Sequence, residues 1–550
     1  MKLKLPGEPF QTLLLSGMDE LIQEDISSRI WKKDHTVWKP DPQEITNRLG
    51  WLTIADRMKE ALPRLERLAD EVRRAGIEKV YLLGMGGSSL APEVFSKTFP
   101  GGEISLEVVD STHPDYLNAL RDRITPETTL FLVATKSGST VETLSFFKTF
   151  YNLMMERVGE DQAGKHFIGI TDPGSRLEDL AEAYQFRDLF LNDPEIGGRY
   201  SVLSYFGLVP ARLLGIDVEQ LLDAARTMSE RCRMDPSAGQ NPGVLLGNAL
   251  GVLAANGRDK VTFFSSPEIA SFPNWTEQLL AESTGKEGRG ILPVVEKAPG
   301  APDVYGNDRV FVFLSLGEEE AFAAAQDALE KTGQPVIRIE IDDTHQLGGQ
   351  FFLWEMATAI AGYHLEINPF NQPNVESAKD KARGMMSAYQ EHGQLPEGEM
   401  TSPDPDILDA FLNTHLESGS YLAVQAYLPP RDELTTALHR FQNLIRDRCQ
   451  RTTTVGYGPR YLHSTGQLHK GDSGQGLFLQ LISRPANDLE IPQKAGEASS
   501  SVSFGTLIHA QALGDAQALR DGGRNVLSFQ LGDHPLDELE LLLNKIRRTA

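Results

Sequence analysis

The sequence has only two cysteines, Cys232 and Cys449, in 550 residues, and it contains no run of 18 apolar residues. Two cysteines cannot build a disulfide framework or a cysteine-rich zinc site, and they suit a reducing compartment. Without a long apolar run we expect no transmembrane helix, and the start, Met1–Pro6, lacks the apolar core of a signal peptide. A cytoplasmic protein is therefore expected.

Basic residues are also scarce, because 53 Lys and Arg face 77 Asp and Glu, which gives a net charge of −24. This balance disfavours nucleic acid or an anionic membrane as the main partner. An anionic metabolite would have to be held by backbone amides and a few well-placed cations. The 40% hydrophobic and 24% charged residues are ordinary for a globular protein, and the length suggests three or four units.

Short β-rich runs alternate with helical stretches after a helical first segment of 75 residues. The predicted strands of a first series are 80–83, 104–109, 130–134 and 167–170, and those of a second series are 261–264, 310–314 and 336–341. Strands separated by helices are typical of parallel βαβ units with helices on both faces of the sheet. We predict two α/β sandwiches in tandem.

A third unit is expected after a linker rich in proline, glycine and acidic residues at 396–405 (PEGEMTSPDP). Beyond the linker, 421–428 and 476–482 are strand-like and 433–449 is helical, whereas 494–503 is predicted to be a polar loop. This smaller C-terminal unit is either α/β or α+β. The expected divisions are a helical segment, two sandwich domains, a linker and the third unit, at 1–75, 76–200, 201–395, 396–406 and 407–550.

A glycine-rich turn, Gly84–Leu90 (GMGGSSL), follows the first predicted strand. Such a turn lets backbone amides approach an anion at a helix N-terminus. A dinucleotide site is an alternative, since Asp110 ends the next strand, but the GxGxxG pattern requires glycine where Ser89 stands. A purely structural turn is also compatible with these residues.

The segment Thr135–Thr143 (TKSGSTVET) follows the third predicted strand and holds four hydroxyls and a lysine within its first six residues. Hydroxyls, exposed amides and one ammonium form a good cradle for a phosphate monoester. The alternative is a serine- and threonine-rich helix cap, with Glu142 and Thr143 in the first turn. Both loops follow strand C-termini of one parallel sheet, where open α/β sheets bind ligands.

Three further segments carry polar residues in ordered surroundings: Gly197–Ser201 (GGRYS), Gln278–Lys286 (QLLAESTGK) and Ile367–Lys379 (INPFNQPNVESAK). Taken singly, Arg199 and Glu282 are as compatible with exposed charges as with a site. Taken in order with the two loops, the set resembles the phosphoglucose isomerase family over about residues 50–390. The matching motifs are GxGGS at Gly84–Ser88, the sugar-phosphate loop at Lys136–Thr143, GGR[FY]S at Gly197–Ser201, ESxGK at Glu282–Lys286 and NPFDQxxVExxK at Asn368–Lys379.

The segment Gly458–Gly471 (GPRYLHSTGQLHKG) is similar to the isomerase half of bifunctional transaldolase/glucose-6-phosphate isomerases. We expect no transaldolase half before residue 50, and a separate transaldolase is a possible partner. The resemblance implies two sugar-isomerase domains, a homodimer whose cleft the partner chain completes, and a place in glycolysis and gluconeogenesis.

An aldose–ketose isomerase needs a base for the C2 proton, a donor at the developing oxyanion and a grip on the phosphate. The resemblance implies Glu282 as base, Arg199 as enediolate stabiliser and Lys379 as an aid to ring opening, and it implies no metal or organic cofactor. The substrate-binding residues that it implies are Gly87, Ser88, Thr135, Lys136, Ser137, Ser139, Thr140, Gln278 and Gln372.

Two departures from the family pattern concern residue 371 and histidine. Asn371 replaces an aspartate, which removes a charge close to Lys379, and we expect the turn to survive because shape and one acceptor are kept. The region 303–308, where many members carry a ring-opening histidine, has none. By position we place His345 first in this role, with His463 and His469 as rivals. If all three are structural, Lys379 and water would open the ring.

Two other functions stay open at this point. A non-catalytic sugar-phosphate sensor would keep the 135–140 loop but would not need Glu282, Arg199 and Lys379 together. An isomerase that also accepts mannose 6-phosphate would keep all of these residues.

Overall fold

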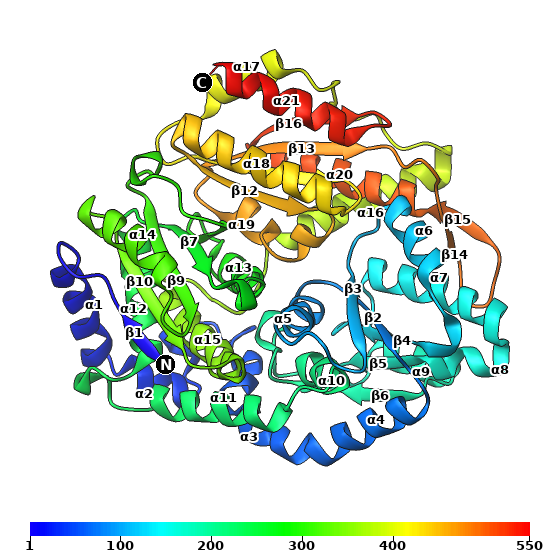
Figure 1. Ribbon diagram of the computed structural model, residues 1–550, viewed down its shortest axis with the longest axis horizontal. Coiled ribbons are helices and arrows are strands. Elements are labelled where there is room, and N and C mark those ends of the chain that lie inside the picture. Colours follow the sequence, from blue (N-terminus) through cyan, green and yellow to red (C-terminus); the bar gives the residue numbers. More distant parts are fainter. Residues whose placement is uncertain (550) are drawn as a thin grey trace.

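The computed structural model describes residues 1–549, apart from the side chains at 376, 378, 545 and 547–549. Three large sheets, two of them parallel throughout and one with a single antiparallel edge strand, are each flanked by helices and lie around a common centre (Figure 1). The two tandem α/β sandwiches predicted from the strand pattern are confirmed.

The first sheet has the strand order β3-β2-β4-β5-β6 and is parallel throughout. Its strands are β2 (Lys79–Gly84), β3 (Ser105–Val109), β4 (Thr129–Ala134), β5 (Phe167–Thr171) and β6 (Asp188–Leu191). Every residue of β4 and β5 is buried, as expected for central strands covered on both faces. Strand β6 was not predicted because it is a four-residue edge strand with a single fully buried position.

Helices α5 (Leu90–Thr98) and α7 (Val141–Val158) begin just after the two polar loops of the first sheet. The other α-helices of this unit are α6 (Pro114–Arg123), α8 (Glu160–Ala163) and α9 (Arg176–Ala183). Before this unit come α1 (Gln11–Gln23) to α4 (Leu62–Arg74), as the helical pattern of the first 75 residues predicts.

The second sheet has the order β1-β10-β9-β7-β8. The parallel strands are β7 (Lys260–Ser265), β8 (Leu292–Val295), β9 (Arg309–Leu316) and β10 (Val336–Ile341). Strand β1 (Lys2–Lys4) pairs antiparallel with β10. Strand β1 was not predicted, because a three-residue segment with two lysines is too short to show an alternation of apolar and polar residues.

The helices of the second unit are α10 (Tyr205–Leu213), α11 (Val218–Cys232), α12 (Pro242–Ala255), α13 (Phe272–Thr284), α14 (Glu320–Lys331) and α15 (Leu347–His364). Helix α15 is buried over its first sixteen residues and packs against α11, α12 and α13. A helix that is apolar all round belongs in an interior. Helix α13 packs on this core and carries Glu282.

The third unit is built on a parallel sheet with the order β12-β11-β13-β16. Its strands are β11 (Tyr421–Tyr427), β12 (Thr452–Tyr457), β13 (Gly476–Ser483) and β16 (Asn525–Leu531), and its helices include α17 (Pro405–His415), α18 (Asp432–Cys449), α19 (Gly466–Gly471), α20 (Phe504–Asp521) and α21 (Pro535–Thr549). Of the two alternatives left open, this unit is therefore α/β.

The third unit contacts both other units (Figure 1). A hairpin of β14 (Glu490–Pro492) and β15 (Ser500–Ser503) reaches α7 of the first unit, so the predicted polar loop 494–503 ends in a strand. Helix α16 (Val375–His392), which the predicted boundary at 395 assigns to the second unit, packs against α20. The exact division into units stays a prediction.

No helix within residues 1–549 is both long and apolar enough to cross a membrane.

Candidate active site

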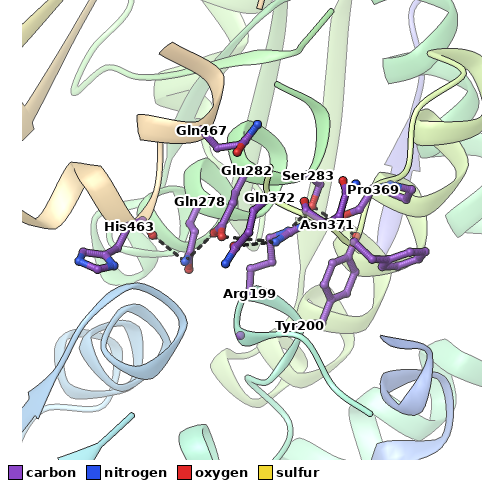
Figure 2. A network of polar contacts seen from close by, with 12 residues as sticks. Arg199, Tyr200, Gln278, Glu282, Ser283, Pro369, Asn371, Gln372, His463 and Gln467 are labelled. Carbon is purple, nitrogen blue, oxygen red and sulfur yellow. Dashed lines mark hydrogen bonds and ion pairs between the residues drawn. The ribbon is translucent and has the colours of Figure 1, made fainter. Parts of the chain in front are cut away.

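Four separate segments bring Glu282 and Arg199, two of the predicted catalytic residues, together with Gln278, Gln372 and His463 (Figure 2). They are the end of α13, a short 3₁₀ helix at Gly198–Tyr200, the turn at 368–372 and a second 3₁₀ helix at Arg460–His463. The last of these belongs to the third unit, so all three units face this site.

Glu282 lies in the last turn of α13 with a side chain that is 10% exposed. Its Oε2 accepts a hydrogen bond of 3.0 Å from Nε2 of Gln278, and its Oε1 lies 3.4 Å from Nη1 of Arg199. Residues four apart share one face of a helix, so α13 itself aligns the amide with the carboxylate. These two contacts fix the position of the carboxylate, and its partial exposure leaves it accessible to a ligand.

The Arg199 side chain is 3% exposed, and each nitrogen of its guanidinium has a partner. Nε donates to Oγ of Ser283 at 2.7 Å, and Nη2 donates to the carbonyl oxygens of Pro369 at 2.7 Å and Asn371 at 3.1 Å. The contacts of Nη1 are longer, 3.5 Å to Oε1 of Gln372 and 3.4 Å to Glu282. The short bonds fix the orientation of the guanidinium, and the Nη1 edge is the part that can turn to a ligand.

The turn at 368–372 survives the replacement of aspartate by Asn371, as expected. The amide N–H of Phe370 donates to Oδ1 of Asn368 at 2.9 Å, which stabilises the turn. Oδ1 of Asn371 accepts a bond of 2.9 Å from Nζ of Lys286, a residue to which the sequence reading gave no role. Lys379 lies near the start of α16 and is partly exposed.

Glycine is required where the first loop meets the other segments. Gly86 has a φ of +55°, and a Cβ there would lie 2.7 Å from the carbonyl oxygen of His463. A Cβ on Gly87 would lie 2.1 Å from the carbonyl oxygen of Gly198. Only glycine allows both approaches. The loop that includes the buried Ser88 is thus one wall of the site.

The loop at 135–140 leads directly into α7, whose N-terminus has no side-chain cap. The hydroxyls of Thr135 and Thr140 are 2.9 Å apart, and the exposed Ser137 accepts from the hydroxyl of the exposed Ser139 at 3.0 Å. Lys136 pairs with Asp172, which follows β5. The open anion-binding groups here are therefore hydroxyls and the amides at the start of an 18-residue helix.

His463 connects this loop with Glu282. Its Nε2 lies 3.1 Å from Oε1 of Glu142, in the first turn of α7, and its carbonyl oxygen accepts a 2.8 Å bond from Nε2 of Gln278. Burial alone would raise the pKa of Glu142, but the charge and hydrogen bond of His463, with a bond from Gln511, lower the pKa overall. The imidazole is thus held against an ionised carboxylate.

The other two histidines considered from the sequence lie in different surroundings. His345 contacts the ring of Phe99 and lies 3.9 Å from Asp343, and within residues 1–549 no hydrogen bond or ion pair joins it to Glu282 or Arg199. His469 is buried among aromatic rings of the third unit. The preference for His345 by position is therefore not supported by its contacts, because the turn before α15 does not reach Glu282.

Arg460 fixes the segment that carries His463. Its guanidinium pairs with Glu93 of α5 and lies 3.1 Å from Asp110, at the end of β3. Asp110, which could have suggested a dinucleotide site, thus has a structural partner. Sequence reasoning did not single out Arg460, and the only available signal was its place in the Gly458–Gly471 segment.

A family model described as phosphoglucose isomerase matches residues 52–304. A glucose-6-phosphate isomerase of Rubrobacter xylanophilus is 31% identical over 408 residues, which cover 65% of this chain and 91% of the relative. The chain belongs to the phosphoglucose isomerase family. Another relative, a glucose-6-phosphate isomerase of Acholeplasma laidlawii, is 29% identical over 381 residues, covering 60% of this chain and 88% of the relative.

Two solved structures show the same fold as this member of the phosphoglucose isomerase family. A hypothetical protein of Thermus thermophilus has a TM-score of 0.60 at 24% identity and covers 70% of this chain and 100% of its own. A glucose-6-phosphate isomerase of Chlamydia trachomatis has a TM-score of 0.57 at 16% identity, covering 73% and 89%. The third unit lies beyond the family-model match, and the narrower resemblance to a bifunctional enzyme stays a prediction.

Proposed function

We propose that this chain interconverts glucose 6-phosphate and fructose 6-phosphate through an enediolate, with Glu282 as the base. The observation that carries the proposal is the contact of 3.4 Å between the carboxylate of Glu282 and the guanidinium of Arg199, both nearly buried. A carboxylate and a fixed cation side by side are what proton transfer next to a carbonyl requires.

The base acts on the open-chain sugar. Glu282 takes the C2 proton, the C2–H electrons form the C1–C2 double bond, and the carbonyl oxygen on C1 becomes the oxyanion. The carboxyl group of Glu282 then returns the proton to C1, while the proton of the C2 hydroxyl moves to the oxygen on C1, so that C2 becomes the ketose carbonyl and C1 carries the hydroxyl. The bond from Gln278 orients the carboxylate for both steps.

Arg199 stabilises the oxyanion in this proposal. Its Nε and Nη2 hydrogen bonds hold the guanidinium in place, so no reorganisation is needed when the negative charge forms. The long contacts of Nη1 are the ones that a substrate oxygen would replace. Gln372, which lies on one of these contacts, is placed to bind the same part of the sugar.

The phosphate is expected at the 135–140 loop and the start of α7. The removal of two neutral donors in Ser137→Ala/Thr140→Ala should weaken inhibition by inorganic phosphate and raise KM for fructose 6-phosphate in parallel. The expected change is at least about 10²-fold, because each of the two hydrogen bonds to a charged partner contributes about 1.5–3 kcal/mol. A matched control is Ser237→Ala/Thr227→Ala, at exposed positions of the second unit. Unchanged inhibition by phosphate would move the anion site to another loop.

Ring opening is assigned to His463, with Lys379 assisting. The imidazole is paired with Glu142, which follows the phosphate loop, and its main chain contacts Gln278 beside the base. A histidine paired with a carboxylate can donate and accept a proton near neutral pH. This assignment replaces His345 as the preferred residue.

The test of the function is isomerisation of fructose 6-phosphate by the full-length chain, followed by the same assay with mannose 6-phosphate. Turnover of the first sugar is expected. Binding without turnover of either sugar would favour the non-catalytic sensor. Turnover of both would widen the substrate range without changing the roles of Glu282 and Arg199.

The homodimer stays a prediction. The chain itself supplies Glu282, Arg199 and His463 to one site, so the third unit occupies a side of the cleft that the family resemblance assigns to a partner chain.

A further inference from the structure

Lys286 lies beside Arg199 but is held only by neutral oxygens. It is fully buried, and its Nζ donates to the carbonyl oxygens of Asn368 at 2.9 Å and Asn371 at 2.5 Å and to Oδ1 of Asn371 at 2.9 Å. Among the side chains that the structure describes, none with a carboxylate forms an ion pair with it. A buried lysine normally has such a partner.

These contacts fit the charged form of the side chain. Three oxygens surround Nζ and match the three N–H bonds of an ammonium, whereas a neutral amine would turn its lone pair toward one of these oxygens, none of which can donate a hydrogen bond to it. Burial first, and then the charge of Arg199, lower the pKa of Lys286 well below its usual value, while Glu282, Glu287 and Glu44 oppose this change. The three oxygen acceptors hold the proton on Nζ against this desolvation.

The carbonyl oxygen of Asn371 joins the two cations. It accepts from Nζ of Lys286 and also from Nη2 of Arg199 at 3.1 Å. Glu282 is the carboxylate in contact with this pair, through Nη1 of Arg199. Two buried cations thus share one contacting carboxylate, so the resting site holds an excess of positive charge. Such an excess is costly to bury.

We propose that Lys286 is a second electrostatic residue of the active site, whose charge stays uncompensated because residue 371 is asparagine, and that it stabilises the negative charge that Glu282 carries before proton transfer. The inference rests on the proposed function, since it takes Glu282 as the base. Proton abstraction moves a negative charge from the carboxylate to the enediolate, while both cations stay in place. Lys286 therefore also favours the enediolate, without touching it.

The other charged or titratable groups around this pair are mostly engaged elsewhere. Glu287 pairs with Lys39 at the surface, and Glu142 is held by His463 and Gln511. The charged groups that act on Lys286 are Arg199, Glu282, Glu287 and Glu44, and those beside Glu282 are Arg199 and Tyr200. None of these changes in the variants below.

The test measures kcat/KM for fructose 6-phosphate as a function of pH on the full-length enzyme. The quantity compared is the pH at which kcat/KM falls on the acidic side, here called the acidic limb. Asn371→Asp is nearly isosteric and adds a negative charge beside Lys286, and Lys286→Met removes the positive charge. Both should move the acidic limb to higher pH by about one unit, as expected for one charge about 10 Å away at an effective dielectric constant of about 20. Asn371→Ala, the control, removes the amide oxygen without adding a charge, and a water can take its place at Nζ of Lys286, so the limb should stay in place.

The variants separate charge from structure. If Asn371→Asp leaves the limb unmoved, or Asn371→Ala moves it equally, the inference is wrong even though the wild-type chain is an isomerase. Lys286→Met is open to misfolding, and the isosteric Asn371→Asp then decides alone. A wild-type chain that isomerises no sugar phosphate at any pH would overturn the proposed function, and this inference with it.

Discussion

Replacing Glu282 by glutamine is expected to lower turnover of fructose 6-phosphate by about 10²–10⁴-fold, the usual contribution of a general base. Glutamine keeps the shape and can accept from either Gln278 or Arg199 through its one oxygen, but it cannot accept the C2 proton. KM should change little, because the phosphate is bound at the 135–140 loop. Steady-state kinetics with purified full-length enzyme measure both quantities.

Glu287→Gln is the matched control for this experiment. Glu287 lies five residues further along the chain and pairs with Lys39 at the surface, so turnover should stay within about twofold of the wild type. Glu282 is not the base if Glu282→Gln retains more than about a tenth of wild-type turnover.

His463→Ala is expected to slow turnover of cyclic glucose 6-phosphate by about 10²-fold, because the proton must move between O1 and O5 before Glu282 can act. Exchange of the C2 proton with deuterated solvent in an aldotetrose 4-phosphate should be spared. That sugar cannot form a ring, since its O4 is esterified, so it bypasses the ring-opening step. Proton NMR follows the exchange for both sugars.

His345→Ala is the control, and it should leave both reactions unchanged because the side chain contacts Phe99 and Asp343 instead of the site. Equal loss of both reactions in His463→Ala would mean that the residue supports the site structurally. Loss of ring opening in His345→Ala alone would restore the assignment made from sequence position.

Much of the fold could be predicted from the sequence because central strands are apolar without interruption. The apolar runs at 130–134 and 167–170 are flanked by segments with a helical period of apolar residues. This alternation of strands and helices predicts parallel sheets. The edge strands β1 and β6 were not predicted, because a short strand with exposed side chains has no distinctive sequence pattern. The third unit was left open between α/β and α+β because β12 and β16 carry mixed burial.

The candidate site was predictable only as a set of motifs. Glu282 and Arg199 could be named from the family resemblance, and they do meet in space. Lys286 was part of a motif but received no role, because nothing local indicates that its ammonium reaches Asn371. Arg460 was missed for the same reason, since its partners Glu93 and Asp110 lie far away along the chain, in the first unit.

The sequence by itself determined the α/β class, the family resemblance and the residue types that the chemistry needs, because these depend on local period, turns and short motifs. Tertiary structure decided which histidine lies by the phosphate loop and which cation shares an oxygen with Arg199. Those contacts depend on how the three units pack against one another. The side chain of His463 can meet Glu142 only because the third unit lies over the first, and no pattern within a short window of sequence carries that information.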